Sequence, residues 1–282
     1  ATAGVALFAI FMPDDVQSVS DAGRRAALRE VILLYSGVTL ATGILTWLVI
    51  PHRKHIGDSS RSIFKGAFAV LNRPLVWAQA AVIICAYCGY KGLDNYSLYA
   101  VQVLGMDEVE GAKLAAIGVY VRPFAAVAAG LFADRWSAAG ALRIVFAVAL
   151  ISYVALALVS PDGALVLVIY GNLFVSFFAV FALRGVYFAL LQENDVPPFL
   201  TGAVAGTVSF IGYTPEIFFG PITGRILDAN PGALGFQHYF LFLAFVSAIG
   251  VAVVGVLVRL QRAGSAAKWP NEDALMRLSS TK

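Results

Sequence analysis

Charged residues are scarce in this chain of 282 residues: Asp, Glu, Lys and Arg together make up 13% of it. Soluble domains contain about a quarter charged residues. Hydrophobic residues account for 60% of the chain, and the mean hydropathy is +0.80. This composition predicts an all-α, polytopic membrane protein. The net charge of +3 is small, and no nucleic-acid partner is expected.

Residues that bind metals or perform covalent chemistry are also few. Cys85 and Cys88 form a C-x-x-C pair inside an apolar stretch. In a soluble protein this spacing would suggest redox or zinc chemistry. Here no second ligand pair lies nearby, so buried small hydrophobic side chains are the favoured interpretation. The sequence contains no His-Glu-x-x-His, Gly-x-Ser-x-Gly or paired intramembrane aspartate motif. We therefore predict neither an enzyme nor a metal or cofactor site.

Long apolar runs are plentiful, and about 20 residues suffice to span a membrane. The apolar stretch 1–12 is shorter, and no basic segment precedes it as in a signal peptide. We interpret it as the end of a helix that begins outside the chain, which is then a fragment of a longer protein. Residues 13–30 are polar and predicted to be a loop, helical in part from Asp21. Seven full spans are predicted: 31–50, 75–104, 111–131, 142–159, 164–191, 202–227 and 236–258.

Basic residues set the expected organisation and orientation. The predicted divisions are 1–50, the end of an N-terminal half; 51–74, a cytoplasmic linker; 75–260, a six-helix half; and 261–282, a cytoplasmic tail. Twelve basic residues lie on the side of the linker and the C-terminus: Arg53, Lys54, Arg61, Lys65, Arg73, Arg135, Arg143, Arg259, Arg262, Lys268, Arg277 and Lys282. Four lie in the opposite connections: Arg24, Arg25, Arg29 and Lys113. Because Lys and Arg accumulate in cytoplasmic loops, the C-terminus is predicted to be cytoplasmic in a plasma membrane, such as the inner membrane of a bacterium.

Five charged residues lie deep inside the predicted spans after the linker. In span order they are Lys91 and Asp94 on the first, Arg122 on the second, Arg184 on the fourth and Glu216 on the fifth. Each would cost about 2.5–3.5 kcal/mol at a lipid-facing helix centre, so all five are expected to face protein or a watery cavity. The order charged, charged, uncharged occurs twice along the six spans. Two nested three-helix repeats would produce this pattern.

Helical spacing places other polar residues on the same faces as these charges. The candidates for solute binding are Lys91, Asp94, Asn95, Arg122, Asn172, Arg184, Tyr187 and Tyr213. Structural alternatives stay open. Lys91 and Asp94, at i and i+3, could neutralise one another. Arg122 and Glu216 could form an ion pair that only holds helices together, and Arg225 could form a surface pair with Asp228.

A helix break is predicted beside Glu216. Pro215 removes a backbone donor in the middle of a span, and Gly220 and Pro221 follow within two turns. Broken helices at membrane depth usually line a binding site. The sequence therefore favours this span as one wall of a cavity.

Two motifs indicate a family. The stretch from Gly130 to Arg135, Gly-Leu-Phe-Ala-Asp-Arg, resembles the Gly-x-Leu-Ala-Asp-Arg signature of the major facilitator superfamily of transporters, with Phe132 in place of Leu. Ser137, Ala138 and Ala139 then replace the glycine and basic residues usual in that family. Gly-Pro-Ile-Thr-Gly at 220–224 is similar to another element of the family. The whole stretch 184–228 resembles bacterial permeases of the sugar-phosphate-permease-like kind.

The resemblance implies a six-helix half of a major-facilitator fold, made of two three-helix inverted repeats and preceded by one full and one partial helix of the other half. In that fold the first two helices of each repeat line the cavity. The resemblance also implies a gating loop that contains Gly130, Asp134 and Arg135.

A secondary transporter working by alternating access is the predicted function. Three positive and two negative deep charges leave a bias of +1, which favours a small anionic solute such as an organic acid or a phosphate ester. Arg184, with Tyr187 one turn away, is the predicted anion ligand, because arginine binds carboxylate or phosphate with two N–H groups. Glu216 or Asp94 is predicted to carry a coupling proton. The expected partners are the solute, the lipid bilayer and the missing N-terminal half; the alternative is a transporter-like sensor that signals to a partner protein.

Overall fold

The computed structural model describes residues 21–49, 70–159 and 166–263. Within these residues the regular elements are all helices, without any strand. Six helical stretches are long and apolar enough to cross a membrane. The predicted class, an all-helical polytopic membrane protein, is thus confirmed. The chain divides into two compact units, Ala1–Ser59 and Ser60–Lys282. Most of the predicted linker, 51–69, lies outside the described residues.

In the first unit the described part is one helix, α2 (Asp21–Val49). It begins at the position where the polar stretch was predicted to become helical and continues through the predicted span. Three threonines lie on the apolar part of α2. The hydroxyls of Thr39, Thr42 and Thr46 each donate to a carbonyl one turn earlier, at 2.7–2.9 Å. Because these polar groups are satisfied inside the helix, α2 remains suited to a membrane.

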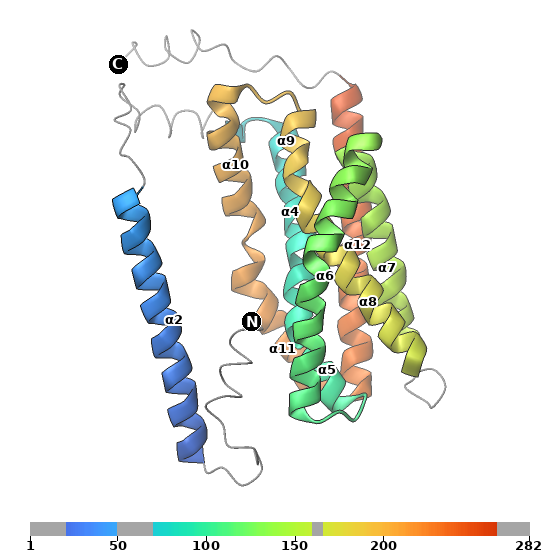
Figure 1. Cartoon of the computed structure of the whole chain (residues 1–282). Helices are drawn as coiled ribbons and strands as arrows, with labels where there is room; N and C mark the ends of the chain where they lie inside the picture. Colours follow the sequence, from blue (N-terminus) through green and yellow to red (C-terminus); the bar gives the residue numbers. More distant parts are fainter. Residues whose placement is uncertain (1–20, 50–69, 160–165, 264–282) are drawn as a thin grey trace. The chain divides into compact units, whose positions relative to one another are not determined.

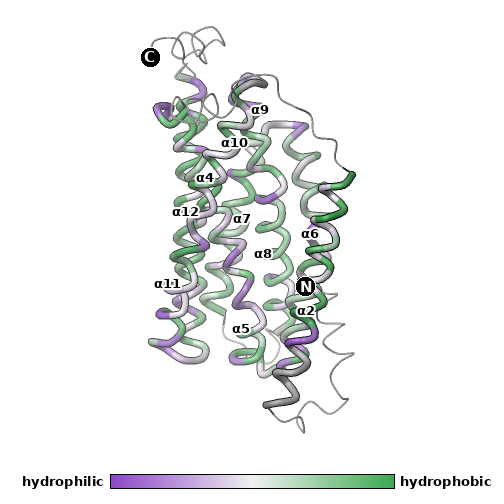
Figure 2. Tube along the Cα trace, turned by 90° about the vertical axis from the view of Figure 1, so that its left-hand side faces the viewer, coloured by the Kyte–Doolittle hydropathy of each residue, from purple (hydrophilic) through white to green (hydrophobic). Residues whose placement is uncertain are grey.

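The second unit is a helical bundle (Figure 1). Its elements in chain order are α4 (Pro74–Gly92), η2 (Leu93–Asn95), α5 (Tyr96–Gln102), α6 (Glu108–Arg135), α7 (Ala138–Leu158), α8 (Val166–Val186), η4 (Tyr187–Ala189), α9 (Leu190–Glu193), α10 (Pro198–Gly212), α11 (Pro215–Ala229) and α12 (Ala233–Arg262). The segments η2 and η4 are short 3₁₀ turns, so α4 to α5 and α8 to α9 each run on as nearly continuous helices. Hydrophobic residues cover most of α8 and α12 (Figure 2).

Packing in this unit follows a small number of helix pairs. The helix α12 packs against α7 and α4, α8 packs against α6 and α7, and α10 packs against α4. Close approach depends on glycine at two of these contacts. A Cβ atom on Gly118 of α6 would overlap the ring of Phe177 of α8, and one on Gly212 of α10 would overlap Ile83 of α4. Small residues of this kind let helix backbones approach within a membrane.

The centre of the unit is aromatic and apolar. The rings of Tyr96, Tyr99, Phe236 and Phe240 are fully or almost fully buried, and they contact one another edge-on or tilted with centroids 5.1–6.3 Å apart. Edge-to-face contacts at these distances are favourable for aromatic pairs. Cys85 and Cys88 are buried free thiols near this centre. Their interpretation as buried small hydrophobic side chains is confirmed.

The connection between α6 and α7 is shorter than the sequence predicted. The helix α6 continues through Asp134 to Arg135, and α7 begins at Ala138. The turn is therefore Trp136–Ser137, and the predicted loop residues Gly130, Asp134 and Arg135 lie in the last turns of α6. Apolar periodicity stops at Leu131, but the helical backbone needs no apolar residues once it reaches the polar interface.

A side chain from elsewhere in the fold caps α7. The Ser137 hydroxyl accepts a hydrogen bond from the Gly140 amide at 2.9 Å, as an N-cap residue does. The Glu193 carboxylate of α9 accepts from the amides of Ala138 and, at 3.1 Å, Ala139. A negative charge at a helix N-terminus is favourable because the first amides carry partial positive charge. Glu193 thus joins α9 to the start of α7.

Next to this cap, a buried polar group joins three helices. The Asn194 side chain donates to the Gln79 amide oxygen of α4 at 3.2 Å and accepts from the Gln261 amide of α12 at 2.7 Å. Both Gln79 and Asn194 are buried. Together with Glu193, this contact places the start of α4, the start of α7 and the end of α12 at one end of the bundle.

The predicted span 202–227 consists of two helices of 15 residues each, α10 and α11. They are separated by Tyr213 and Thr214, directly before Pro215. The Thr214 hydroxyl donates to the Ile211 carbonyl at 2.8 Å, which satisfies a group at the end of α10. The break predicted at Pro215 is therefore present. Gly220 and Pro221 were also predicted to break the helix. Both lie inside α11, which continues past them, so no helix ends at either residue.

Candidate functional site

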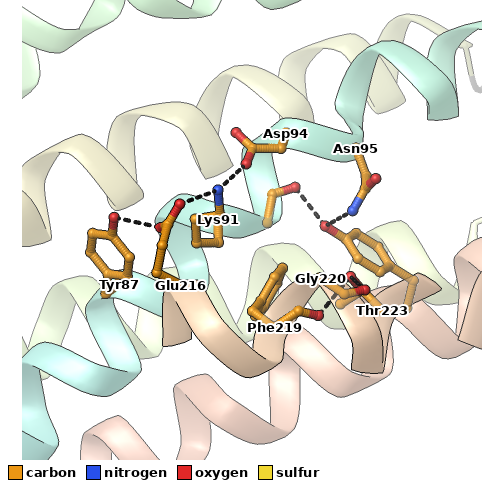
Figure 3. A network of polar contacts seen from close by, with 10 residues as sticks. Tyr87, Lys91, Asp94, Asn95, Glu216, Phe219, Gly220 and Thr223 are labelled. Carbon is orange, nitrogen blue, oxygen red and sulfur yellow. Dashed lines mark hydrogen bonds and ion pairs between the residues drawn. The ribbon is translucent and has the colours of Figure 1, made fainter. Parts of the chain in front are cut away.

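A cluster of charged side chains lies where α4 meets the start of α11 (Figure 3). The Lys91 ammonium is 2.7 Å from a carboxylate oxygen of Asp94 and 3.4 Å from one of Glu216. The Tyr87 hydroxyl donates to the second oxygen of Glu216 at 2.8 Å. We call Tyr87, Lys91, Asp94 and Glu216 the charged cluster. It joins two spans that are 125 residues apart in sequence at the Lys91–Glu216 contact.

Local structure explains the placement of these four residues. Tyr87 and Lys91 of α4 and Asp94 of η2 follow one another at intervals of four and three, so they share one face of this nearly continuous helix. Glu216 lies in the first turn of α11, directly after the helix break. A carboxylate is favourable in a first turn because of the helix dipole. Because α11 begins directly after the break, Glu216 lies next to the face of α4 that carries Lys91.

The two acidic side chains of the cluster are more exposed than the lysine. The exposed fractions of the Asp94 and Glu216 side chains are 58% and 57%, against 22% for Lys91. A carboxylate accepts several hydrogen bonds, so a single lysine and a single tyrosine leave acceptor positions unused. The cluster can therefore bind further donors or cations. Within the described residues, no group of three or more His, Cys, Asp or Glu side chains is arranged to hold a metal ion.

Arg184 of α8 lies beside the charged cluster, against aromatic rings. Its guanidinium carbon is 3.9 Å from the ring centroid of Tyr90 and 5.9 Å from that of Tyr87. Contacts of this kind attract a cation to the face of the ring. Arg184 is partly buried, and no carboxylate of the described residues lies within 4.0 Å of its guanidinium. The guanidinium is therefore held beside the two rings and is not neutralised by an acid of the described residues.

Two more tyrosines, Tyr187 and Tyr213, continue this group of contacts. The hydroxyls of Tyr187 and Tyr213 are 3.2 Å apart, and the ring of Tyr213 lies 4.8 Å from that of Tyr87. Tyr213 also borders a hollow of about 400 Å³ on α10 and α11, which is lined in addition by Gly206, Ser209, Phe210, Thr214 and Ile217. Contacts among Tyr87, Tyr213 and the buried Tyr187 therefore extend from the charged cluster to the helix break.

Six of the residues predicted from sequence meet in this region: Lys91, Asp94, Arg184, Tyr187, Tyr213 and Glu216. Asn95 and Asn172 have other partners. The Asn95 amide donates to the Tyr239 hydroxyl of α12 at 3.2 Å. Asn172 of α8 exchanges hydrogen bonds with Ser152 of α7, at 2.7 and 2.9 Å. Both asparagines therefore connect helices in this structure.

Two of the three structural ion pairs considered from the sequence are not formed among the described residues. Arg122 is exposed on α6, and within the described residues it forms no ion pair with Glu216, whose basic partner is Lys91. Arg225 and Asp228 are likewise exposed and are not within ion-pair distance of one another. The third alternative is present, since Lys91 and Asp94 do pair. Helical spacing predicts pairs within one helix, but it does not indicate which faces of different helices meet.

Tyr87 and Tyr90 were not among the predicted binding residues. Tyr87 lies about one helical turn before Lys91, and this spacing placed it on the same polar face without indicating a binding role. Tyr90 lies directly before Lys91 and carries no such signal. Its role depends on the packing of α8 near α4, which brings the Arg184 guanidinium over its ring.

Two bacterial proteins are similar in sequence to this chain. Inner membrane protein YqcE of Escherichia coli (strain K12) is 25% identical over 274 residues, which cover 94% of the chain and 62% of YqcE. Inner membrane protein YihN of the same organism is 39% identical over 80 residues, which cover 28% of the chain and 19% of YihN. The chain thus spans less than two thirds of the length of either relative. No family model matches the chain, and no solved structure gives a significant match.

Proposed function

We propose that the chain is part of a secondary transporter of the major-facilitator type, which moves a small anionic solute across a bacterial inner membrane by alternating access. The solute would be an organic acid or a phosphate ester. The observation that carries the proposal is Arg184: a partly buried guanidinium, oriented by two tyrosine rings and not neutralised by an acid of the described residues. Such a group binds carboxylate or phosphate through paired N–H donors.

The surroundings of Arg184 support the same function. The broken span α10–α11 borders the site, and interrupted helices in transporters commonly lie at the substrate site. The two similar proteins, YqcE and YihN, are both named as inner membrane proteins. The signature at Gly130–Arg135 adds the resemblance to the transporter superfamily, with Asp134 and Arg135 as gating residues at the end of α6.

The cavity would be lined by the helices that carry the deep charges, α4, α6, α8 and the pair α10–α11. The helices α7 and α12, whose charged residues lie only near their ends, would lie outside it. In this proposal the six-helix unit is completed by an N-terminal half, of which α2 is the last span and residues 51–74 the cytoplasmic linker. Such a half would cover the carboxylates of Asp94 and Glu216, which are accessible in the described unit.

Transport assays on variants of the full-length protein in liposomes test the role of Arg184. We expect Arg184→Ala to abolish uptake of the solute while folding is retained, because the guanidinium has no acid partner to leave unpaired. Arg184→Lys should recover little uptake, since an ammonium cannot replace a planar fork. Arg225→Ala is the matched control. Arg225 is an exposed arginine in the second half of α11, away from Glu216, so this variant should transport normally. Full uptake by Arg184→Ala would contradict the proposal.

Coupling to protons is assigned to Glu216, with Asp94 as the second carboxylate of the cluster. In the same liposomes, Glu216→Gln should lose accumulation driven by a proton gradient yet retain exchange of internal for external solute, since exchange needs no net proton movement. Accumulation at the normal level by Glu216→Gln would exclude Glu216 as the proton carrier.

A further inference from the structure

The charges around the candidate site are separated by helix. The charged cluster on α4, η2 and α11 contains two carboxylates and one ammonium, so its net charge is −1. The helix α8 contributes Arg184, and α6 carries the exposed Arg122; neither helix has an acidic residue within the stretches 111–133 and 166–192. The site therefore has a negative side and a positive side rather than one uniform field.

The two positive residues lie close to the same helix contact. The helices α6 and α8 pack together, and the Ala126 backbone is 3.0 Å from the position that a Cβ on Gly185 would take. Arg122 is one turn before Ala126, and Arg184 directly precedes Gly185. Both arginines are therefore within about one turn of this contact.

Tyr87 stands between the two sides. Its hydroxyl donates to Glu216 at 2.8 Å, and its ring is 5.9 Å from the Arg184 guanidinium. Arg184 and Glu216 do not form an ion pair, so they are more than 4.0 Å apart. The two opposite charges therefore do not neutralise one another directly.

We propose that the transported solute is dipolar: it carries, besides the anionic group bound by Arg184, a cationic amine bound by Asp94 and Glu216. This inference rests on the proposed function and specifies its substrate class. A purely anionic solute would satisfy Arg184, but its far end would face a net negative charge with unused acceptor positions. An amine at that end supplies the donors that the exposed carboxylates can accept. Because the two sides are separated by a ring, the charges of the solute should be farther apart than in an α-amino acid.

Matched probes test this proposal by thermal stabilisation of the purified full-length protein at pH 7, since a ligand that binds the folded state raises its melting temperature. One set contains 4-aminobutyrate, butyrate and n-butylamine. The other contains 2-aminoethyl phosphate, ethyl phosphate and ethanolamine. We expect at least one dipolar probe to bind about tenfold or more tightly than its anionic counterpart, the factor that one charge-assisted contact supplies. Glycine, whose charges are closer together, should bind more weakly than 4-aminobutyrate.

Asp94→Asn should remove the advantage of the dipolar probe and leave the affinity of the anionic probe nearly unchanged. Asp228→Asn, an exposed acid at the end of α11, is the control and should keep the advantage. Equal binding of the anionic and dipolar probes, or no binding of either dipolar probe, would overturn the dipolar solute. Anion binding that needs Arg184 but gains nothing from the amine would leave the proposed function standing. Stabilisation that is unaffected by Arg184→Ala would refute both.

Discussion

Lys91 and Arg184 show how two cations at similar depth take different roles. The compact ammonium of Lys91 fits between two carboxylates, at 2.7 and 3.4 Å, and is neutralised there. The guanidinium of Arg184 lies 3.9 Å from the centroid of the Tyr90 ring in a cation–π contact, and it has no acid of the described residues as a partner. Charge alone did not distinguish these residues in the sequence. The distinction comes from the partners that other helices supply.

A residue-scale prediction concerns Asn172, which the sequence indicated as a solute ligand. Its side chain exchanges two hydrogen bonds with Ser152, whose side chain is buried. Interhelical hydrogen bonds in membranes are worth about 0.6 kcal/mol on average and up to about 1.7. We therefore expect Asn172→Ala to destabilise the protein by about 1–2 kcal/mol and to leave solute affinity unchanged, as measured by thermal unfolding and by binding.

The comparison for Asn172→Ala is Ser152→Ala, which should destabilise through the same two helices. The double variant should cost less than the sum of the two single changes, because both remove one shared contact. If Asn172→Ala lost solute affinity at normal stability, Asn172 would be a solute ligand, as the sequence indicated, and not only a link between helices.

At the scale of helices, apolar periodicity located the spans well and their ends poorly. Helix α6 extends beyond its apolar run to Arg135, since its end is set by the turn at Trp136–Ser137 and by the capping of α7. The carboxylate that strengthens this cap belongs to Glu193, 55 residues away from Ala138. A contact of such sequence separation leaves no local signal. Pro215, by contrast, acts on its own backbone, and its break was predictable.

An element-scale prediction compares two glycines of α6. A Cβ on Gly118 would overlap Phe177 of α8, whereas a Cβ on Gly130 would meet nothing within 4 Å. Overpacking a well-packed contact costs about 1–3 kcal/mol. We expect Gly118→Ala to lower the free energy of unfolding by about that amount and to separate α6 from α8, which also carries Arg184.

Gly130→Ala is the control on the same helix, and it should be neutral or slightly stabilising because alanine favours a helix over glycine. Thermal unfolding of both variants in one detergent gives the comparison. Equal melting temperatures for the two variants would mean that α6 and α8 are not packed at Gly118 as described.

At the scale of the whole molecule, most of the basic residues near the ends of the spans lie at one end of the bundle. The contacts of Glu193 and Asn194 place the start of α7 and the end of α12 at this end. It includes Arg135, Arg143, Arg259 and Arg262. The turn between α5 and α6, at the other ends of their helices, contains no Lys or Arg from Val103 to Asp107. We therefore propose, from the positive-inside rule, that the basic end faces the cytoplasm.

A reporter enzyme that is active only outside the cytoplasm tests this orientation. Fused after Lys282, it should be inactive. Fused after Gly105, in the turn that precedes α6, it should be active, which makes this fusion the matched control. Activity at Lys282 combined with inactivity at Gly105 would reverse the proposed orientation.

Burial of both thiols has a practical consequence for following motion in this protein. Cys85 and Cys88 are the two cysteines of the chain, and both are buried in the hydrophobic core. Buried cysteines of this kind are inert toward reagents in solution. A single cysteine introduced at an exposed place, such as Gly206 beside the hollow on α10, would be the one thiol of the chain that an alkylating dye reaches. Its labelling rate could then report opening and closing of the cavity against the unaltered native background.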